Sequence, residues 1–247
     1  MLKKLKYYVQ LVRVMLHLIR GLLTALLIFP LVGSEGIKRR VTIWSGQLLT
    51  ICNVRVDLKL TSMPPATVIV SNHISWLDIF VINSVVPCRF VAKSDIRSWP
   101  LLGWLAEKAG TIYISRGSKA DVKRIYQYLI DQIVAGERVA FFPEGTTAAQ
   151  GEVLPFHANL FEAAIHAKVP IQPFAVRYLN AAGELNPAAD FTGDMTFATS
   201  MSNILQAGAI TVELHGLEQI SSEGAHRRDL AALSRTAVAQ ALQVSVD

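Results

Sequence analysis

Short apolar runs alternate with longer amphipathic stretches from residue 55 to the end of the chain. The runs rich in Val, Ile, Phe and Tyr have the length of buried strands, whereas the longer stretches repeat their apolar residues at helical spacing. Strands and helices that alternate in this way predict an α/β fold with a mostly parallel sheet flanked by helices. The predicted strands are Arg55–Leu60, Thr67–Ser71, Arg89–Ala92, Thr111–Ser115, Arg138–Phe142, Ile171–Arg177 and Ala209–His215.

Helices are predicted in most of the intervals between these strands. Residues 180–208 are an exception, because their periodicity is weak and Ala, Asn, Gly and Asp are frequent. We predict an irregular insertion there. The predicted helices are Trp76–Val85, Leu101–Lys108, Lys119–Ala135, Leu160–Ala167 and Arg227 to about Gln243.

The N-terminal segment contains two uncharged runs of 14 residues, Gly21–Ser34 and Val41–Val54, separated by the cluster Lys38-Arg39-Arg40. A helix of that length covers about 21 Å, which is shorter than the bilayer core of about 30 Å. We therefore predict a two-helix membrane-anchoring segment, residues 1–54, that lies in one leaflet with its basic cluster at the headgroups. Pro30, Gly33 and Gly36 are the predicted hinge. A single span and a cleaved signal peptide are the alternatives. Residues 55–247 are predicted to form one domain.

Composition and charge favour a lipid partner. Apolar residues make up 51% of the chain and charged residues 17%, and the first 40 residues carry a net charge of +7. These basic residues are interleaved with apolar runs, which is typical of contact with anionic lipid and does not favour nucleic acid. Cys52 and Cys88 lie in apolar surroundings without metal-like spacing, so we expect reduced core thiols and no metal site.

The first candidate chemical motif is Asn72-His73-Ile74-Ser75-Trp76-Leu77-Asp78, directly after the predicted strand that ends at Ser71. In an α/β sheet this junction is where ligands bind. On an unbroken helix His73 and Asp78 would lie about 140° apart, so we expect His73 in the turn before the helix, with Ser75 as N-cap. A carboxylate that orients an imidazole supports the imidazolium formed when the imidazole takes a proton from a hydroxyl. The motif thus predicts a general base with its partner.

Two further motifs follow strands. Phe142-Pro143-Glu144-Gly145-Thr146 ends an apolar strand, and its glycine permits close approach of the backbone to a ligand. Thr146 and neighbouring amides could bind an anionic headgroup. Arg116, after the strand that ends at Ser115, could pair bidentately with a phosphate. Taken singly, each of these is also an ordinary strand end.

In order, the strings NHISWLD, ISRG, FFPEGT and VPIQPFAV resemble the four ordered blocks of the glycerolipid acyltransferase family, typified by lysophosphatidic acid acyltransferase. The likeness covers roughly residues 55–215. It implies an acyl-CoA or acyl carrier protein thioester as donor, a lysophospholipid hydroxyl as acceptor, and His73 as base with Asp78 as its partner. The residues that it assigns to the acceptor pocket are Arg116, Glu144, Gly145 and Thr146, and Lys93 matches a basic position of the family.

The resemblance implies a lysophospholipid acyltransferase, with 1-acylglycerol-3-phosphate, giving phosphatidic acid, as the expected acceptor. Many members have arginine where this chain has Thr147, and often Lys-Gly near residues 156–160. Another lysolipid such as lyso-ornithine lipid therefore remains an alternative, as do a lipid-binding protein without turnover and a hydrolase. No Gly-x-Ser-x-Gly pattern is present, so we expect direct transfer without a covalent intermediate, metal or organic cofactor. The expected location is the membrane, on the cytoplasmic face of the inner membrane.

Overall fold

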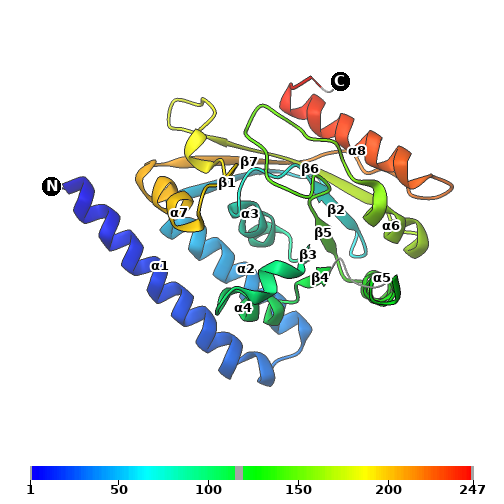
Figure 1. Cartoon of the computed structure of the whole chain (residues 1–247), viewed down its shortest axis with the longest axis horizontal. Helices are drawn as coiled ribbons and strands as arrows, with labels where there is room; N and C mark the ends of the chain where they lie inside the picture. The colour runs from blue at the N-terminus through cyan, green and yellow to red at the C-terminus, as the bar shows by residue number, and fades with distance from the viewer. Residues whose placement is uncertain (1, 115–118, 246–247) are drawn as a thin grey trace.

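A seven-stranded sheet with the order β1-β7-β6-β2-β5-β3-β4 forms the centre of the protein (Figure 1). The computed structural model describes residues 2–114 and 119–245. All neighbouring strands in it are parallel except β6 and β7, which confirms the predicted α/β class with a mostly parallel sheet. The strands are β1 Val54–Lys59, β2 Val68–Ser71, β3 Arg89–Lys93, β4 Ile112–Ile114, β5 Val139–Phe141, β6 Ile171–Leu179 and β7 Ile210–Gly216.

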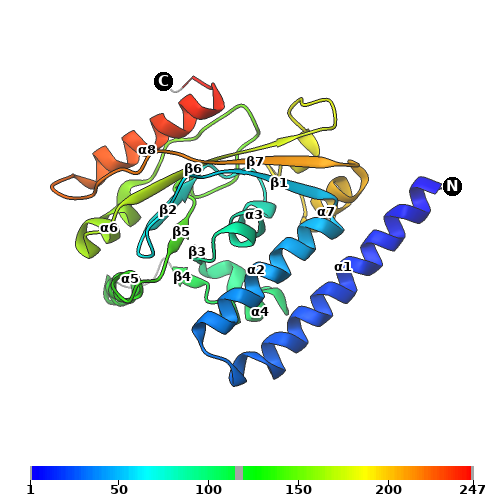
Figure 2. The ribbon, with the colours of Figure 1, turned by 180° about the vertical axis from the view of Figure 1, so that it is seen from behind.

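Helices cover both faces of the sheet (Figures 1 and 2). One apolar cluster contains residues of α2, α3 and α7, and a second contains residues of α5, α6 and α8. Strand β2 separates them, because Ile69 belongs to the first cluster and Val68 and Val70 to the second, as the alternation of side chains along a strand requires. The helices are α1 Leu2–Leu27, α2 Ser34–Ile51, α3 Leu77–Val85, α4 Leu102–Lys108, α5 Lys119–Val134, α6 Glu162–Ala167, α7 Phe197–Gln206 and α8 Arg227–Leu242.

The N-terminal segment differs from the prediction. Helix α1 is the one helix in the described part of the chain with the length and apolar composition to cross a membrane. Helix α2 instead packs against α3 and buries Ser45, Leu48 and Leu49. The chain bends between the two helices in a short 3-10 turn that includes Pro30, whereas Gly36 lies within α2. The structure thus has one apolar N-terminal helix where two were predicted.

The predicted irregular insertion at residues 180–208 is also wrong in part, because it contains α7. The side chain of Thr196 accepts a hydrogen bond from the amide of Thr199 at 3.1 Å and caps this helix. Ser200 is fully buried and accepts a hydrogen bond from the indole nitrogen of Trp76 at 3.1 Å. Packing against α1, and of Phe197 on Trp76 with ring centroids 4.9 Å apart, stabilises a helix whose Thr, Ser and Asn content gives a weak local signal.

Candidate active site

The turn after β2 brings His73 and Asp78 together. Nδ1 of His73 lies 2.8 Å from Oδ2 of Asp78, and α3 begins only at Leu77, so the histidine lies before the helix. The same oxygen accepts hydrogen bonds from the amides of Ile74 and Ser75 at 2.8 and 2.9 Å. The predicted Ser75 cap is therefore wrong, because α3 has no side-chain cap at its N-cap residue and the Asp78 carboxylate binds the amides that precede it.

Tyr178 on β6 is a fourth partner of Asp78, which sequence analysis missed. Its hydroxyl donates to Oδ1 of Asp78 at 2.5 Å, and both residues are fully buried. Burial, and then the charge of Asp78, raise the pKa of Tyr178 well above its usual value, so the phenol remains a donor. The available signal was a hydroxyl in a largely apolar strand, two residues beyond the block that ends at Val176.

The imidazole of His73 lies flat on Phe142, with ring centroids 3.9 Å apart and planes 6° apart. Its side chain is 18% exposed, so a ligand can reach it. With Nδ1 facing the carboxylate, Nε2 is the nitrogen left to accept a proton. The main-chain carbonyl of His73 accepts a hydrogen bond from the amide of Ala148 at 2.7 Å. The turns after β2 and β5 are therefore fastened to each other beside the histidine.

Glu144 strengthens this connection between the two turns. Its Oε1 accepts a hydrogen bond from the amide of His73 at 2.9 Å, and its Oε2 accepts one from the amide of Leu154 at 3.2 Å. Burial is the largest cause that raises the pKa of Glu144 to about 7, against the two amide hydrogen bonds, which lower it. Glu144 is 4% exposed, so the structure shows it supporting the site from within.

Gly145 and Thr146 lie at the exposed rim beyond Glu144. Gly145 has a φ of +69°, which favours glycine, and a Cβ there would lie 3.4 Å from the ring of His157. Thr147, where many relatives in the family resemblance have arginine, donates its hydroxyl to the main-chain carbonyl of Phe191. This side chain therefore fastens the rim to the segment before α7.

Of the remaining predicted site residues, Lys93 lies toward the β4 end of the sheet. Lys93 is the last residue of β3, is exposed, and pairs in register with Ile114 of β4. Strands β3 and β5 are parallel neighbours. Lys93, at the end of β3, therefore lies at the same edge of the sheet as Phe142, which directly follows β5. Arg116 lies outside the described residues. The structure thus brings His73, Asp78 and Glu144 together and leaves Lys93 at a distance along that edge.

Asn72 fastens the turn after β2 to the neighbouring strand β6. Its Nδ2 donates to the carbonyl of Val176 at 3.0 Å, and its Oδ1 accepts from the amide of Val176 at 2.9 Å. Both side-chain atoms of Asn72 are buried, so each needs a hydrogen-bond partner, and the main chain of Val176 supplies both partners. The first residue of the motif therefore has a structural role between β2 and β6.

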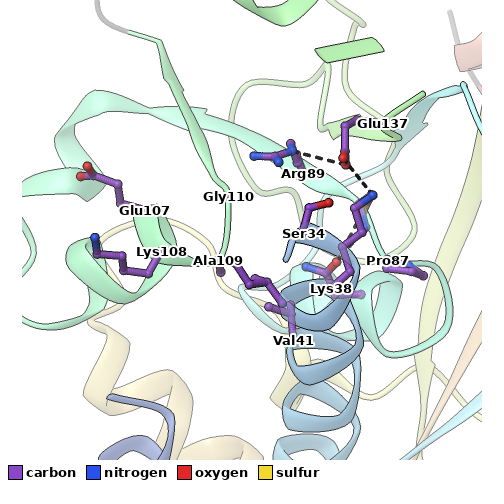
Figure 3. A pocket seen from close by; sticks show the side chains of 13 residues that line it. Ser34, Lys38, Val41, Pro87, Arg89, Glu107, Lys108, Ala109, Gly110 and Glu137 are labelled. Atoms are coloured by element: carbon purple, nitrogen blue, oxygen red, sulfur yellow. Dashed lines mark hydrogen bonds and ion pairs between the residues drawn. The ribbon is translucent and has the colours of Figure 1, made fainter. Parts of the chain in front are cut away.

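A separate pocket of about 150 Å³ lies at the opposite edge of the sheet, between α2 and the start of β3 (Figure 3). In it Glu137, just before β5, pairs with Lys38 of α2 at 2.9 Å and with Arg89 of β3 at 3.4 Å. Its lining contains no histidine. The pocket therefore holds an ion-pair cluster that connects the N-terminal segment to the sheet, away from His73.

Comparisons with known proteins identify the family of this chain. The Acyltransferase family profile matches residues 54–177. The lyso-ornithine lipid O-acyltransferase of Pseudomonas aeruginosa is 36% identical over 83% of this chain and 80% of its own length. The 1-acyl-sn-glycerol-3-phosphate acyltransferase of Neisseria gonorrhoeae is 34% identical over 61% of this chain and 59% of its own length.

A crystal structure shows the same fold. The 1-acyl-sn-glycerophosphate acyltransferase PlsC of Thermotoga maritima superposes with a TM-score of 0.64 at 18% identity, over 95% of this chain and 96% of that one. The protein belongs to the acyltransferase family of lysolipid-acylating enzymes. The family resemblance drawn from its four motifs is confirmed.

Proposed function

We propose that the protein transfers a fatty acyl chain from a thioester to a lysolipid hydroxyl, with His73 as general base and Asp78 as its partner. The observation that carries this is the 2.8 Å contact between Nδ1 of His73 and a fully buried Asp78 carboxylate. Nε2 takes the hydroxyl proton, the alkoxide oxygen attacks the thioester carbonyl, and the carbon–sulfur bond breaks. The departing thiolate takes the proton from the imidazolium. The donor in this proposal is acyl-CoA or acyl carrier protein.

For the acceptor, we favour lyso-ornithine lipid. Relatives with that name match 83% and 77% of the chain, whereas the Neisseria glycerophosphate acyltransferase matches 61%. Residue 147 is a threonine, so this position offers no cation to a phosphate, and its hydroxyl is already hydrogen-bonded to the carbonyl of Phe191. An amino-acid headgroup does not need one. Lysophosphatidic acid remains the second candidate, favoured by the glycerophosphate acyltransferases among the relatives.

A panel of acceptors tests both levels of this proposal. Purified protein is mixed with labelled acyl-CoA or acyl carrier protein thioester and with lyso-ornithine lipid, lysophosphatidic acid or no acceptor, and products are resolved by mass. We expect acylated ornithine lipid as the main product and thioester cleavage only with acceptor. If only lysophosphatidic acid is acylated, then lysophosphatidic acid is the acceptor and lyso-ornithine lipid is not. Thioester cleavage independent of acceptor would support a hydrolase instead.

The membrane side of the function rests on α1. One stripe of this helix is buried against the protein, and its members are Gln10, Val14, His17, Gly21 and Ala25. The nitrogen Nε2 of His17 bonds the carbonyl of Trp44 at 2.9 Å, and Nε1 of Trp44 donates to the carbonyl of His17 at 3.1 Å. Helix α1 therefore lies along the protein over most of its length, which a perpendicular span would not allow without drawing α2 into the bilayer.

The outward face of α1 is largely apolar, although Lys4, Lys6, Arg13 and Arg20 are also exposed on this helix. It exposes Leu5, Val9, Val12, Leu16, Ile19, Leu23 and Leu26, each at least half exposed. Trp99, Leu101 and Trp104 are also exposed, on and before α4, which contacts α1. We propose that this surface inserts into one leaflet, on the cytoplasmic face of the inner membrane.

Vesicle flotation tests this arrangement. The double variant Leu16→Glu, Ile19→Glu should lose binding to vesicles of phosphatidylethanolamine and phosphatidylglycerol, because the charges face the acyl region. The control Leu233→Glu changes an exposed leucine on α8 and should still float. Equal flotation of both variants would show that α1 is not the membrane anchor.

A further inference from the structure

The carboxylate of Asp78 receives hydrogen bonds on both of its oxygens. Oδ2 faces His73, Ile74 and Ser75, all from one short turn. Oδ1 faces Tyr178, which is 100 residues away in the sequence. In the described part of the chain, this phenol is the side-chain donor that reaches the catalytic turn from β6.

We infer that Tyr178 is a positioning residue for the His73–Asp78 pair, whose hydroxyl holds Oδ1 of Asp78 so that Oδ2 stays directed at His73. This inference rests on the acyl transfer proposed above. Tyr178 is fully buried, so it acts through Asp78 and does not touch substrate. No motif of the sequence analysis includes it.

The position of Tyr178 suits this role because its strand is paired within the sheet. Strand β6 lies between β2 and β7 in the sheet, and Tyr178 pairs in register with Val212. Its amide donates to Oε1 of Gln150 at 2.6 Å. Three donors from a single turn move together with that turn, whereas a donor from a neighbouring strand fixes the carboxylate relative to the sheet.

The phenol also provides a neutral donor. A cation at this place would neutralise Asp78 and weaken its support of the imidazolium, whereas a phenol stabilises the carboxylate and leaves its charge in place. The titratable groups around Asp78 are His73 in its own turn, Glu144 in the turn after β5, and Tyr178 on β6. Burial and the Asp78 charge keep Tyr178 protonated, so it is a permanent donor.

The substitution Tyr178→Phe tests the inference and keeps the ring. The ionised Asp78 depends more on the Tyr178 hydroxyl when His73 is neutral than when His73 is protonated. Removal of the hydroxyl therefore favours the state with protonated His73, so the His73–Asp78 pair binds its proton more tightly. We expect kcat to fall roughly tenfold, KM for donor and acceptor to stay within about twofold, and the acid limb of the kcat/KM profile to move to higher pH.

The matched control is Tyr126→Phe. The hydroxyl of Tyr126 is buried on α5 and has no hydrogen-bond partner within the described residues, so its removal should leave kcat, KM and the pH profile unchanged. Circular dichroism of both variants establishes that they are folded before kinetics are compared.

A double-mutant cycle with Asp78→Asn completes the test. If Tyr178 acts through Asp78, Tyr178→Phe should change kcat little in the Asp78→Asn background. An equal fall in both backgrounds would overturn the inference, as would an unchanged kcat and pH profile in an active Tyr178→Phe enzyme. An inactive wild-type protein would instead contradict the proposed function, so the two failures are distinguishable.

Discussion

Two carboxylates at opposite edges of the sheet differ in their partners and in their surroundings. Asp78, at the carboxyl ends of the strands, is fully buried and is bonded by two amides, a phenol and an imidazole. Glu137, at the amino ends, is paired with Lys38 and Arg89. Permanent cations neutralise Glu137, whereas the partners of Asp78 leave its charge to support a proton on His73. The kind of donor distinguishes the proposed chemical site from the structural one.

The largest effect should come from removing the proposed base. His73→Ala should lower the rate of acyl transfer about 10²- to 10⁴-fold, with an unchanged circular dichroism spectrum, because the ring is partly exposed at the rim. The matched change at the other edge, Glu137→Gln, should keep most of the activity. Comparable activity losses in the two variants, measured with saturating thioester and lysolipid, would contradict the distinction between the edges.

Glu144→Gln should have the next largest effect, on stability. A glutamine offers one acceptor oxygen, so the amide of His73 or of Leu154 loses its partner, at a cost of about 1–3 kcal/mol in the free energy of unfolding. Urea unfolding monitored by circular dichroism measures this cost. No loss of stability at any pH would mean that Glu144 does not fasten the two turns.

The pH dependence of stability provides a second reading of Glu144. Its pKa is raised from 4.5 to about 7 in the folded protein, so between these values the folded state binds more protons than the unfolded state. This difference in proton binding adds to the free energy of unfolding below pH 4.5, and the added stability is lost as the pH rises through about 7. Between pH 5 and pH 8, the free energy of unfolding should therefore fall less with rising pH for Glu144→Gln than for the wild type.

The rim can be tested with two glycines of positive φ. Gly145→Ala and Gly151→Ala should each cost about 1 kcal/mol, because both backbones are left-handed, at φ of +69° and +92°. A Cβ at residue 145 would approach His157, whereas one at residue 151 would meet open space. Acyl transfer should thus fall further in Gly145→Ala than in Gly151→Ala. Equal activities would place the acceptor away from this rim.

The smallest effect concerns the cluster at the amino edge. Glu137→Gln should lower the free energy of unfolding by about 1 kcal/mol or less, because its partners are partly exposed. The difference from wild type should shrink in high salt, since ions screen such pairs. Thermal unfolding at two salt concentrations measures it. A salt-independent difference would mean that the pairs are not the source of the loss.

Much of the scaffold of the site follows from local pattern. The angular separation of residues 73 and 78 on a helix requires the histidine to lie in a turn, and the structure has it there. The alternation of strands and helices predicts the parallel sheet. These features depend on neighbours in sequence, so that a single chain segment carries the signal.

The parts that sequence analysis missed depend on tertiary contacts. Tyr178 reaches Asp78 from a strand 100 residues away, and no local pattern encodes that register. Helix α7 has weak propensity and is stabilised by burial of Ser200 and Ile204. Ser75 was a reasonable cap by residue type, but the longer Asp78 side chain takes the amides instead. Long-range packing decided the first two cases, and a local hydrogen bond over three or four residues decided the third.

The strand order has a consequence for how the protein is made. Strand β5 lies between β2 and β3 although it follows both in the sequence, and the bond from His73 to Glu144 joins residues 71 positions apart. Contacts of such long range form late in folding. On the ribosome, the nascent chain cannot complete the surroundings of its imidazole until β6 has been synthesised. The surroundings of the proposed base are therefore complete only after about three quarters of the polypeptide exists.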